Sequence, residues 1–317
     1  MTLQQLRDEH SRLSHPENFK DAIDLIDIYS NFFLVATSSQ RDDQVSTPEA
    51  IEANLVLQMM MTKVLHLKSI IKGVSFTSKN DISLNNIVDP TIVGLLVRNT
   101  YETAGMFNLI FRVNKDGDER QIVYKLWVLS GLKYRQRFIT IITGEGNRIK
   151  AETERQTIDK LIAEIHATKL YNLLDDFNKT KIKNCIKQKD YLIFFENNTV
   201  KNLSWSELYK SMGMRPELFE SLYTHFSFSA HPTNVAVFQF REMFLPESKK
   251  YIGMVLFGLQ YFFVFSSIFI ADYINLNPKK REFFNALPLI DQIVINFQNT
   301  FSRGHEYSIN DSWKALG

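Results

Sequence analysis

The sequence predicts an all-α protein, a multi-helix bundle of long helices with one small β-hairpin near residues 191–200. Three observations support this prediction. Glycine and proline are scarce, with 12 Gly and 8 Pro in 317 residues, whereas an all-β fold with many tight turns uses more of both. Apolar residues recur at helical spacing along most of the chain. A capping residue followed by proline, a typical helix start, occurs at Thr47-Pro48 and at Asp89-Pro90.

The first half of the chain alternates apolar periodic segments with polar ones. Residues 17–38 carry apolar side chains at helical spacing, and the Ser, Asn and Asp residues of 74–89 are typical of a loop. The expected elements up to residue 118 are a helix within 17–38, a helix from Pro48 to Lys72 that stops at Gly73, a loop over 74–89, a helix from Pro90 to Arg112, and a turn over 114–118.

The second half contains the only segment rich in β-formers, YLIFFENNTV, in which an Asn-Asn pair indicates a turn. The expected elements are a helix over 119–143, one very long helix or two over 147–187, the hairpin over 191–200, a short helix capped by Ser204 or Ser206 and ending near Gly213, helices over about 216–230, 234–244, 248–275 and 279–301, and an irregular tail from Ser302.

No repeat and no shift in composition marks a domain boundary, so we expect a single helical domain over residues 1–317. Within it, residues 1–46 form N-terminal helices, residues 47–275 the core region, and residues 276–317 a C-terminal helix with an irregular tail.

Charge and cysteine usage limit the classes of partner. The formal net charge is +2, so no global field draws the protein to nucleic acid or to an anionic membrane, and we expect no DNA partner. The single cysteine, Cys185, excludes an internal disulfide and a zinc site of several thiolates. The first residues, MTLQQLRDEHSRLSH, lack the apolar core of a signal peptide. We therefore expect a cytoplasmic protein, and a homo-oligomer stays open.

The segment 251–271 has no charged residue and is long enough to cross a bilayer. Glycines, Gln260, Ser266 and Ser267 dilute its hydrophobicity, and lysines flank both ends, so the positive-inside rule gives no orientation. We favour a central helix buried on all sides over a membrane span.

The stretch LYTHFSFSAHP is the most site-like local sequence. On a helix, Tyr223, Ser227 and His231 fall at i, i+4 and i+8 and share one face. A phenol, a hydroxyl and an imidazole so aligned can bind a polar ligand or move a proton. The alternative is structural: such groups also link buried helices, and a histidine near a helix C-terminus often caps it.

A second cluster lies on the helix that starts at Pro90. Arg98, Tyr101 and Glu102 share one face amid apolar residues. Buried charges persist when they are paired, so Arg98 pairs either with Glu102 or with a group such as His231. A structural ion pair is the simpler interpretation. If Glu102 and His231 converge, they form an acid/base or metal candidate.

A third cluster, GLKYRQR, interleaves Lys133, Arg135 and Arg137 with Tyr134. Basic groups beside an aromatic ring can contact phosphates, although such a run is more often a solvated helix face. The common catalytic frameworks are absent, since the sequence contains no GxGxxG, P-loop, HExxH, GxSxG or cysteine–histidine zinc spacing. No cofactor is predicted.

At VRNTYE, which runs from Val97 to Glu102, and at YTHFSFSAH, the sequence resembles a bacterial family catalogued as domain of unknown function fifty-six seventy-seven. The segment LSWSELYKSMG resembles the stretch that precedes the second motif in that family. The likeness covers about residues 50–270 and implies a soluble, intracellular helical fold. It brings no established activity.

A more distant likeness is to HEPN-type helical ribonucleases of toxin and phage-defence systems. Those enzymes carry an arginine followed by a histidine after four to six residues on one helix, and no Arg–His pair here has that spacing. The likeness therefore requires Arg98 to reach His231 from another helix.

Two functions of different class follow, together with a third that rests on residues 251–271. The first is a binding or regulatory module, in phage defence or stress response, in which the region of Arg98, Glu102 and His231 holds a ligand or only the fold. Its further ligand-binding candidates are Tyr101, Tyr223 and Ser227. The second is a metal-independent ribonuclease with His231 as general acid/base and Arg98 on the phosphate, while Tyr223 and Ser227 orient the substrate. The third is a membrane-anchored protein. The expected partner is a small ligand or RNA, and we prefer the first function.

Overall fold

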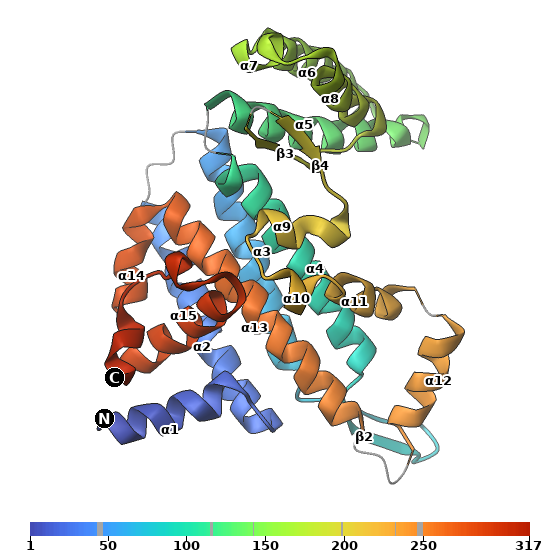
Figure 1. Cartoon of the computed structure of the whole chain (residues 1–317). Helices are drawn as coiled ribbons and strands as arrows, with labels where there is room; N and C mark the ends of the chain where they lie inside the picture. The colour runs from blue at the N-terminus through green and yellow to red at the C-terminus, as the bar shows by residue number, and fades with distance from the viewer. Residues whose placement is uncertain (43–46, 115–116, 142, 198, 232, 246–249) are drawn as a thin grey trace. The chain divides into compact units, whose positions relative to one another are not determined.

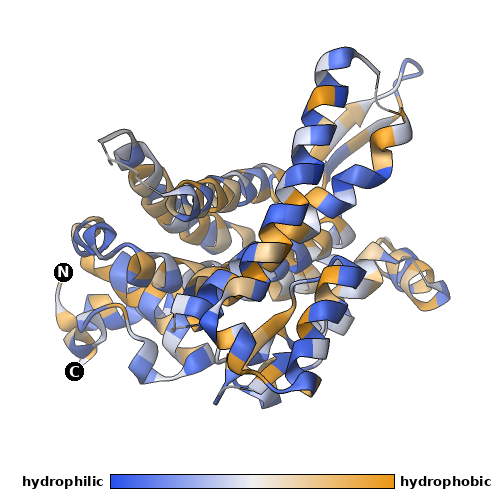
Figure 2. Ribbon diagram, turned by 90° about the horizontal axis from the view of Figure 1, so that it is seen from above, coloured by the Kyte–Doolittle hydropathy of each residue, from blue (hydrophilic) through white to orange (hydrophobic). Residues whose placement is uncertain are grey.

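The computed structural model describes the chain except residues 43–46, 115–116, 142, 198, 232 and 246–249. Helices dominate the described residues, and the strands form two antiparallel two-stranded hairpins (Figure 1). The all-α prediction is confirmed, as is the hairpin near residues 191–200. Colouring by hydropathy shows helices with apolar and polar sides (Figure 2), the pattern from which the sequence predicted them.

The backbone divides into two compact units, residues 1–107 with 212–317, which we call unit 1, and residues 108–211, unit 2. The expectation of one domain over residues 1–317 stays a prediction. Unit 1 holds α1 (Leu3–Ser14), α2 (Phe19–Ser38), α3 (Pro48–Ile70), β1 (Val74–Thr77), β2 (Ser83–Ile87), α4 (Pro90–Asn108, ending at the boundary), α10 (Pro216–Phe219), α11 (Leu222–Ala230), α12 (Asn234–Met243), α13 (Lys250–Leu276), α14 (Arg281–Asn285) and α15 (Leu289–Arg303).

Unit 2 is built on α5, against which α6, α8 and strand β3 pack. Two buried asparagines fix the hairpin: Asn114 accepts from the Phe195 N–H at 3.2 Å, and Asn178 accepts from the Val200 N–H at 2.9 Å. Its elements are the π turn η2 (Leu109–Val113), α5 (Gly117–Arg135), the 3-10 turn η3 (Gln136–Ile141), α6 (Glu145–Ala167), α7 (Lys169–Leu173), α8 (Asp176–Gln188), β3 (Ile193–Glu196), β4 (Thr199–Asn202), η4 (Trp205–Glu207) and α9 (Leu208–Ser211).

Helix α13 is the centre of unit 1. Every residue from Phe262 to Ile274 is buried, and α2, α3 and α15 pack against the helix. The Phe269 ring lies 6.0 Å from that of Phe33 and 4.7 Å from that of Phe107. A helix that is apolar all round requires neighbours on all sides, and these helices supply them.

The same helix is long and apolar enough to cross a membrane, and it is the one such helix among the described residues. Of its most apolar window, 72% is buried inside the protein. This burial agrees with the expectation of a central core helix. The location of the protein in the cell and the membrane-anchored alternative stay untested.

A fully buried ion pair joins α13 to α15. Arg303 donates to Asp272 at 2.9 Å, and the two side chains are 2% and 1% exposed. The Arg303 guanidinium also lies over the Tyr307 ring, 4.0 Å from its centroid. Because a charge in the protein interior is tolerated only when it is paired, each partner depends on the other.

The helix starts predicted from capping residues are correct. The Thr47 hydroxyl accepts from the Ala50 N–H at 3.3 Å, and the Asp89 carboxylate accepts from the Thr91 N–H at 2.8 Å. Asn114 ends η2 in an extended conformation, but the turn expected over 114–118 includes Lys115 and Asp116, which lie outside the described residues.

The loop expected over residues 74–89 is wrong, because these residues form the hairpin of β1 and β2. The strands are short, and every residue of β1 is exposed, so no buried face enforces the apolar alternation on which the prediction relied. Asp81 and Asn86 adopt positive φ angles of 60° and 52°, which these two residue types tolerate better than most.

Three expected helices are broken. Residues 279–301 form α14 and α15, separated before Pro288, because proline disfavours the helical conformation of the residue that precedes it. Residues 216–230 form α10 and α11. Residues 147–187 fall within α6, α7 and α8, where Thr168 and Asp175 cap new helices in place of one long helix or two.

Replacing Arg303 by methionine is expected to lower the free energy of unfolding by about 3–5 kcal/mol, because the fully buried ion pair with Asp272 is lost. Urea unfolding followed by far-UV circular dichroism measures the loss. Lys314→Met is the matched control, since Lys314 pairs with Asp311 at the surface and such pairs contribute at most about 1 kcal/mol. Equal losses in the two variants would contradict the interpretation.

Candidate functional site

Helices α4 and α11 lie against each other at close range in unit 1. A Cβ atom at Gly94 would stand 2.3 Å from the Ser229 hydroxyl oxygen and 3.1 Å from the Ser229 Cβ, so a larger residue at position 94 would require Ser229 to move. On the other side of α4, a Cβ atom at Gly258 of α13 would stand 3.1 Å from Val93. Small residues thus let three helices meet where the predicted site residues lie.

Arg98 is the centre of a polar network between α4 and α11. It donates to Glu102 at 2.9 Å and to the Tyr223 hydroxyl at 2.7 Å, and its guanidinium lies 4.7 Å from the Tyr223 ring centroid. The Arg98 and Glu102 side chains are 19% and 25% exposed. The pKa of Arg98 is raised: burial opposes its charge, but the contacts with Glu102 and Tyr223 outweigh that effect. Burial also raises the pKa of Tyr223.

Tyr101 and Ser227 lie next to this network and support the helices that carry it. The Tyr101 ring lies 5.8 Å from that of Tyr223 and 5.2 Å from that of Phe265, so it is part of the packing of α4 on α13. The Ser227 hydroxyl donates to the Tyr223 backbone carbonyl at 2.6 Å, a contact within its own helix. The network is therefore arranged to hold α11 on α4.

His231 does not join the network. It caps α11 with φ −126° and ψ 88°, outside the helical region, and it is exposed. The helix face shared by Tyr223 and Ser227 therefore ends before His231, because the residue that precedes a proline is disfavoured in helical conformation. Among the described residues, no hydrogen bond or ion pair links His231 to Arg98 or Glu102, and the rise of α11 separates it from Tyr223 by about 12 Å.

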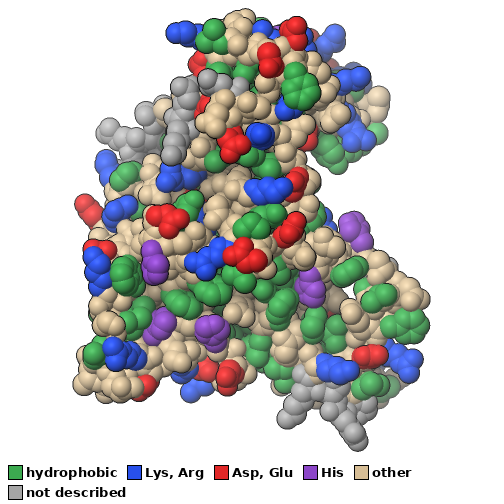
Figure 3. Space-filling view, viewed as in Figure 1, with side chains coloured by type: hydrophobic (Ala, Val, Ile, Leu, Met, Phe, Trp, Pro, Cys, Tyr) green, Lys and Arg blue, Asp and Glu red, His purple; other side chains and the backbone are tan. Residues whose placement is uncertain are grey.

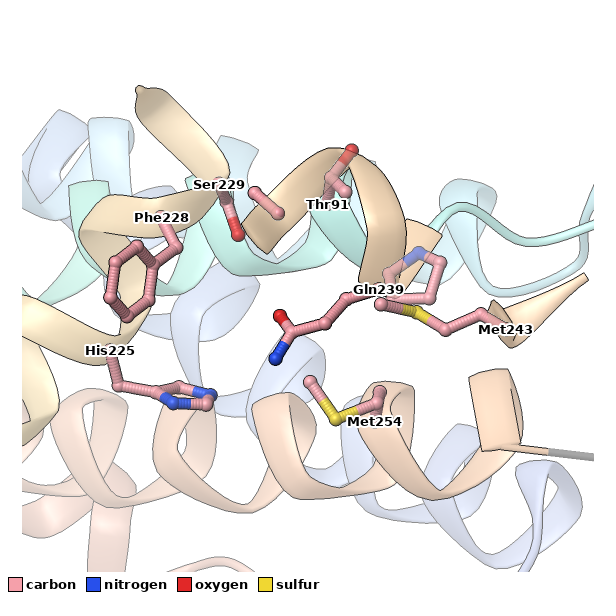
Figure 4. A pocket seen from close by; sticks show the side chains of 9 residues that line it. Thr91, His225, Phe228, Ser229, Gln239, Met243 and Met254 are labelled. Atoms are coloured by element: carbon pink, nitrogen blue, oxygen red, sulfur yellow. The ribbon is translucent and has the colours of Figure 1, made fainter. Parts of the chain in front are cut away.

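An open cavity of about 420 Å³ lies beside this network, between α11, α12 and the first turn of α13. It adjoins a recess of about 50 Å³ that reaches Pro90 and Thr91 at the start of α4. The two spaces share four side chains, His225, Gln239, Met243 and Met254. Figure 4 shows the Gln239 amide directed into the recess toward His225 and Met254.

Two polar groups of this cavity, the His225 imidazole and the Gln239 amide, make no hydrogen bond with any described residue. At the rim, Lys250 lies 3.4 Å from Glu242, so these two charges are paired with each other. The cavity therefore offers neutral donors and acceptors beside two thioethers.

Burial disfavours the charged form of His225. Its ring stands nearly perpendicular to Phe226 at 5.1 Å and to Phe257 at 5.2 Å. Although part of the residue is exposed, burial of the ring lowers the pKa of His225 below its ordinary value. A neutral imidazole has one donor and one acceptor nitrogen.

Helix α12 covers the cavity but is itself little buried. Met243 is its one buried residue, whereas Val235, Val237 and Phe238 are 57%, 59% and 53% exposed. Apolar side chains gather over this end of unit 1 (Figure 3, lower right). A helix with so few inward contacts has little to hold it in one position.

The residues of the cavity were not predicted from the sequence. His225 lies within the stretch that the sequence singled out, two positions after Tyr223, but on a different face of the helix. Gln239 and Met243 of α12 and Met254 of α13 carry no motif, and only the tertiary structure brings them to His225. Within the described residues, no group of three His, Cys, Asp or Glu side chains is placed to hold a metal ion.

Comparison of the chain with protein-family models, with curated proteins and with solved structures gives no match. The resemblances drawn from the two short motifs therefore stay hypotheses, and the function must be argued from the site itself.

Tyr223→Phe is expected to lower the free energy of unfolding by about 1 kcal/mol, because the hydroxyl that accepts from Arg98 is lost while the ring stays beneath the guanidinium. Chemical denaturation measures the change. Tyr134→Phe is the control, since Tyr134 is 55% exposed and a surface substitution costs at most about 0.5 kcal/mol. The same loss in both variants would show that the Arg98 contact contributes nothing to stability.

The C2 proton of His225 is expected to titrate with a midpoint below pH 6.5 in NMR spectra, because burial disfavours the imidazolium. Between the folded and unfolded pKa values the unfolded chain binds more protons, so stability from this group falls as the pH drops below 6.5. Phe257→Ala should move the midpoint back toward 6.5. An unshifted midpoint in the wild type would contradict the burial argument.

Proposed function

We propose that this protein is a ligand-binding module and that its ligand occupies the cavity between α11, α12 and α13. One observation carries the proposal: the unpaired Gln239 amide and His225 imidazole face a cavity of about 420 Å³. This volume lies in the range of small-molecule sites, about 300–1,000 Å³, which combine apolar walls with few polar groups.

The chemistry of the lining favours a flat aromatic ligand that bears a carboxamide-like edge. Thioether sulfurs such as those of Met243 and Met254 make favourable contacts with aromatic rings. An amide such as Gln239 can both donate to and accept from a second amide, and neutral His225 adds one donor and one acceptor. The ligand is neutral in this proposal, because the rim charges of Lys250 and Glu242 already face each other.

The Arg98 network has a positioning role in this proposal. Between α4 and α11, Arg98 already donates hydrogen bonds to Glu102 and to Tyr223. The same helix, α11, carries Tyr223 on the side of α4 and His225 toward the cavity. Fixing α11 through Tyr223 therefore sets the position of the cavity wall.

RNA cleavage by His231 with Arg98 is not part of this proposal. A general acid/base acts on a phosphate only when both groups reach the same substrate. His231 stands beyond the end of α11, without a contact to Arg98 or Glu102 among the described residues. No other observation favours this alternative, which is still untested.

Benzamide is the probe, because it combines an aromatic ring with a carboxamide. In protein labelled with ¹³C at the methionine methyl groups, benzamide is expected to shift the resonances of Met243 and Met254 with a Kd of about 1 mM, equivalent to about 4 kcal/mol. The resonances of Met59 and Met60 in α3 should stay in place. Toluene, which lacks the amide, should bind more weakly.

Gln239→Leu separates the two parts of this expectation. It should weaken benzamide binding and leave toluene binding unchanged or stronger, since only the amide contact is removed. The control is Gln156→Leu on α6, because Gln156 is exposed. Shifts spread over all methionines, or none at saturating benzamide, would refute the site.

A further inference from the structure

Unit 2 carries an excess of positive charge that the net charge of the chain conceals. Residues 108–211 hold 19 Lys and Arg against 13 Asp and Glu, whereas the rest of the chain holds 18 against 22. A segment with an excess of six cations creates a local positive field even in a nearly neutral protein. These cations can bind a common partner only if they lie together on one surface.

The C-terminal ends of α5 and α8 bring several of them together. Lys133 of α5 donates to the Ile186 carbonyl at 2.8 Å, and Ser130 donates to the Lys189 carbonyl at 2.8 Å. The pKa of Lys133 is lowered, first by burial and then by the neighbouring charge of Lys189. These like charges therefore stand close together across two helices.

Helix α8 adds exposed lysines in its last two turns. Lys183 and Lys187 are four residues apart on one face of the helix, and both are exposed. Like charges at this spacing destabilise a helix by a few tenths of a kcal/mol. We define the basic cluster as Lys133, Arg137, Lys183, Lys187 and Lys189. Within the described part of the chain, no salt bridge joins any of the five to a carboxylate, although the charge of Asp159 acts on Lys133.

Exposed aromatic rings accompany the cluster. Tyr134 and Phe138 are 55% and 45% exposed, and their ring centroids lie 5.7 Å apart. The Arg137 guanidinium lies 5.4 Å from the Tyr134 centroid. Arg135, which the sequence grouped with these residues, is not part of the cluster, because it pairs with Glu154.

A cavity adjoins these rings. It measures about 210 Å³ and is lined by Phe138, Asn147 and Lys150, together with groups of the Arg135–Glu154 pair. The wall of this apolar space carries the Asn147 amide and the Lys150 ammonium beside the exposed Phe138 ring. These groups suit a flat ligand that has polar edges and is attached to an anionic backbone. Nucleobases on a phosphate chain have this chemistry.

We infer that the basic cluster of unit 2, with Tyr134 and Phe138, binds single-stranded nucleic acid. The lysines contact phosphates, and the two rings stack on bases. Unpaired bases are needed for stacking, so a duplex is bound less tightly than a single strand. This surface is independent of the ligand cavity proposed for unit 1, and either proposal can fail without the other.

The test uses the full-length protein and fluorescently labelled 12-nucleotide RNA and DNA strands in fluorescence anisotropy. We expect binding at low salt that weakens as salt increases, since phosphate contacts release counterions. The variant Lys183→Gln/Lys187→Gln/Lys189→Gln should lower the affinity about tenfold or more and reduce the salt slope by about 2. The control Lys20→Gln/Lys72→Gln/Lys314→Gln makes the same change of charge in unit 1 and should bind as the wild type does.

Tyr134→Ala examines the stacking contribution. It should weaken binding to single strands several-fold or more while leaving the salt slope unchanged, because it removes a ring and no charge. Thermal unfolding of each variant verifies that it is folded. No binding at low salt, or equal losses in the two triple variants, would overturn the proposal. Equal binding of polyglutamate, with no effect of Tyr134→Ala, would also overturn it and assign the cluster to an acidic protein segment.

Discussion

The burial of α13 is the constraint on which unit 1 depends. From Phe262 to Ile274 the helix has no residue that faces solvent, so it forms only if other helices cover every side. The chain supplies α2, α3 and α15 as direct neighbours. Placing Asp272 in the same buried stretch imposes a second condition, since its charge needs Arg303 from α15. Register along α13 is therefore fixed by one ion pair as well as by packing.

The candidate site follows from how α4 and α11 approach this core. Gly258 of α13 admits Val93 of α4, and Gly94 of α4 admits Ser229 of α11. Each glycine removes a side chain where two helices meet, so α11 lies close enough to α4 for Arg98 to reach Tyr223. The polar network is then a consequence of close packing and also stabilises it, because without α11 Arg98 would keep Glu102 of its own helix but lose Tyr223.

Much of the fold could be predicted from local signals. Thr47 and Asp89 indicate helix starts, because their side chains accept hydrogen bonds from backbone N–H groups within the next three residues. Such signals can be recognised without knowledge of the tertiary structure. The hairpin of β1 and β2 was missed because its strands bury almost nothing, so the alternation of side chains is weak there. The break before Pro288 has a local cause, and attention to the proline would have predicted it.

The site was predictable only in part. Arg98 and Glu102 are four residues apart on one helix, so their pairing follows from the sequence. The contact between Arg98 and Tyr223 spans 125 positions, and only the need to pair a buried charge and the resemblance of short motifs brought the two helices into one hypothesis. Gln239 and Met254 could not be placed near His225, because that requires the path of the chain between α11 and α13. His231 caps the C-terminal end of α11, as one of the two interpretations of the sequence expected, but its spacing from Tyr223 could not show that it lies without contact to Arg98 or Glu102.

Helix α12 connects stability to the proposed binding. Thr233 caps α12, and its hydroxyl accepts from the Ala236 N–H at 3.3 Å. Met243 is the one buried residue of this helix. An isolated helix of this length is only marginally stable in water. Helix α12 therefore depends on the few contacts that it makes with α13 and around the cavity. A ligand that fills the space under Gln239 and Met243 would add contacts that the unbound state lacks. A ligand stabilises the folded state that binds it. Binding would therefore stabilise α12 more than any other element of unit 1.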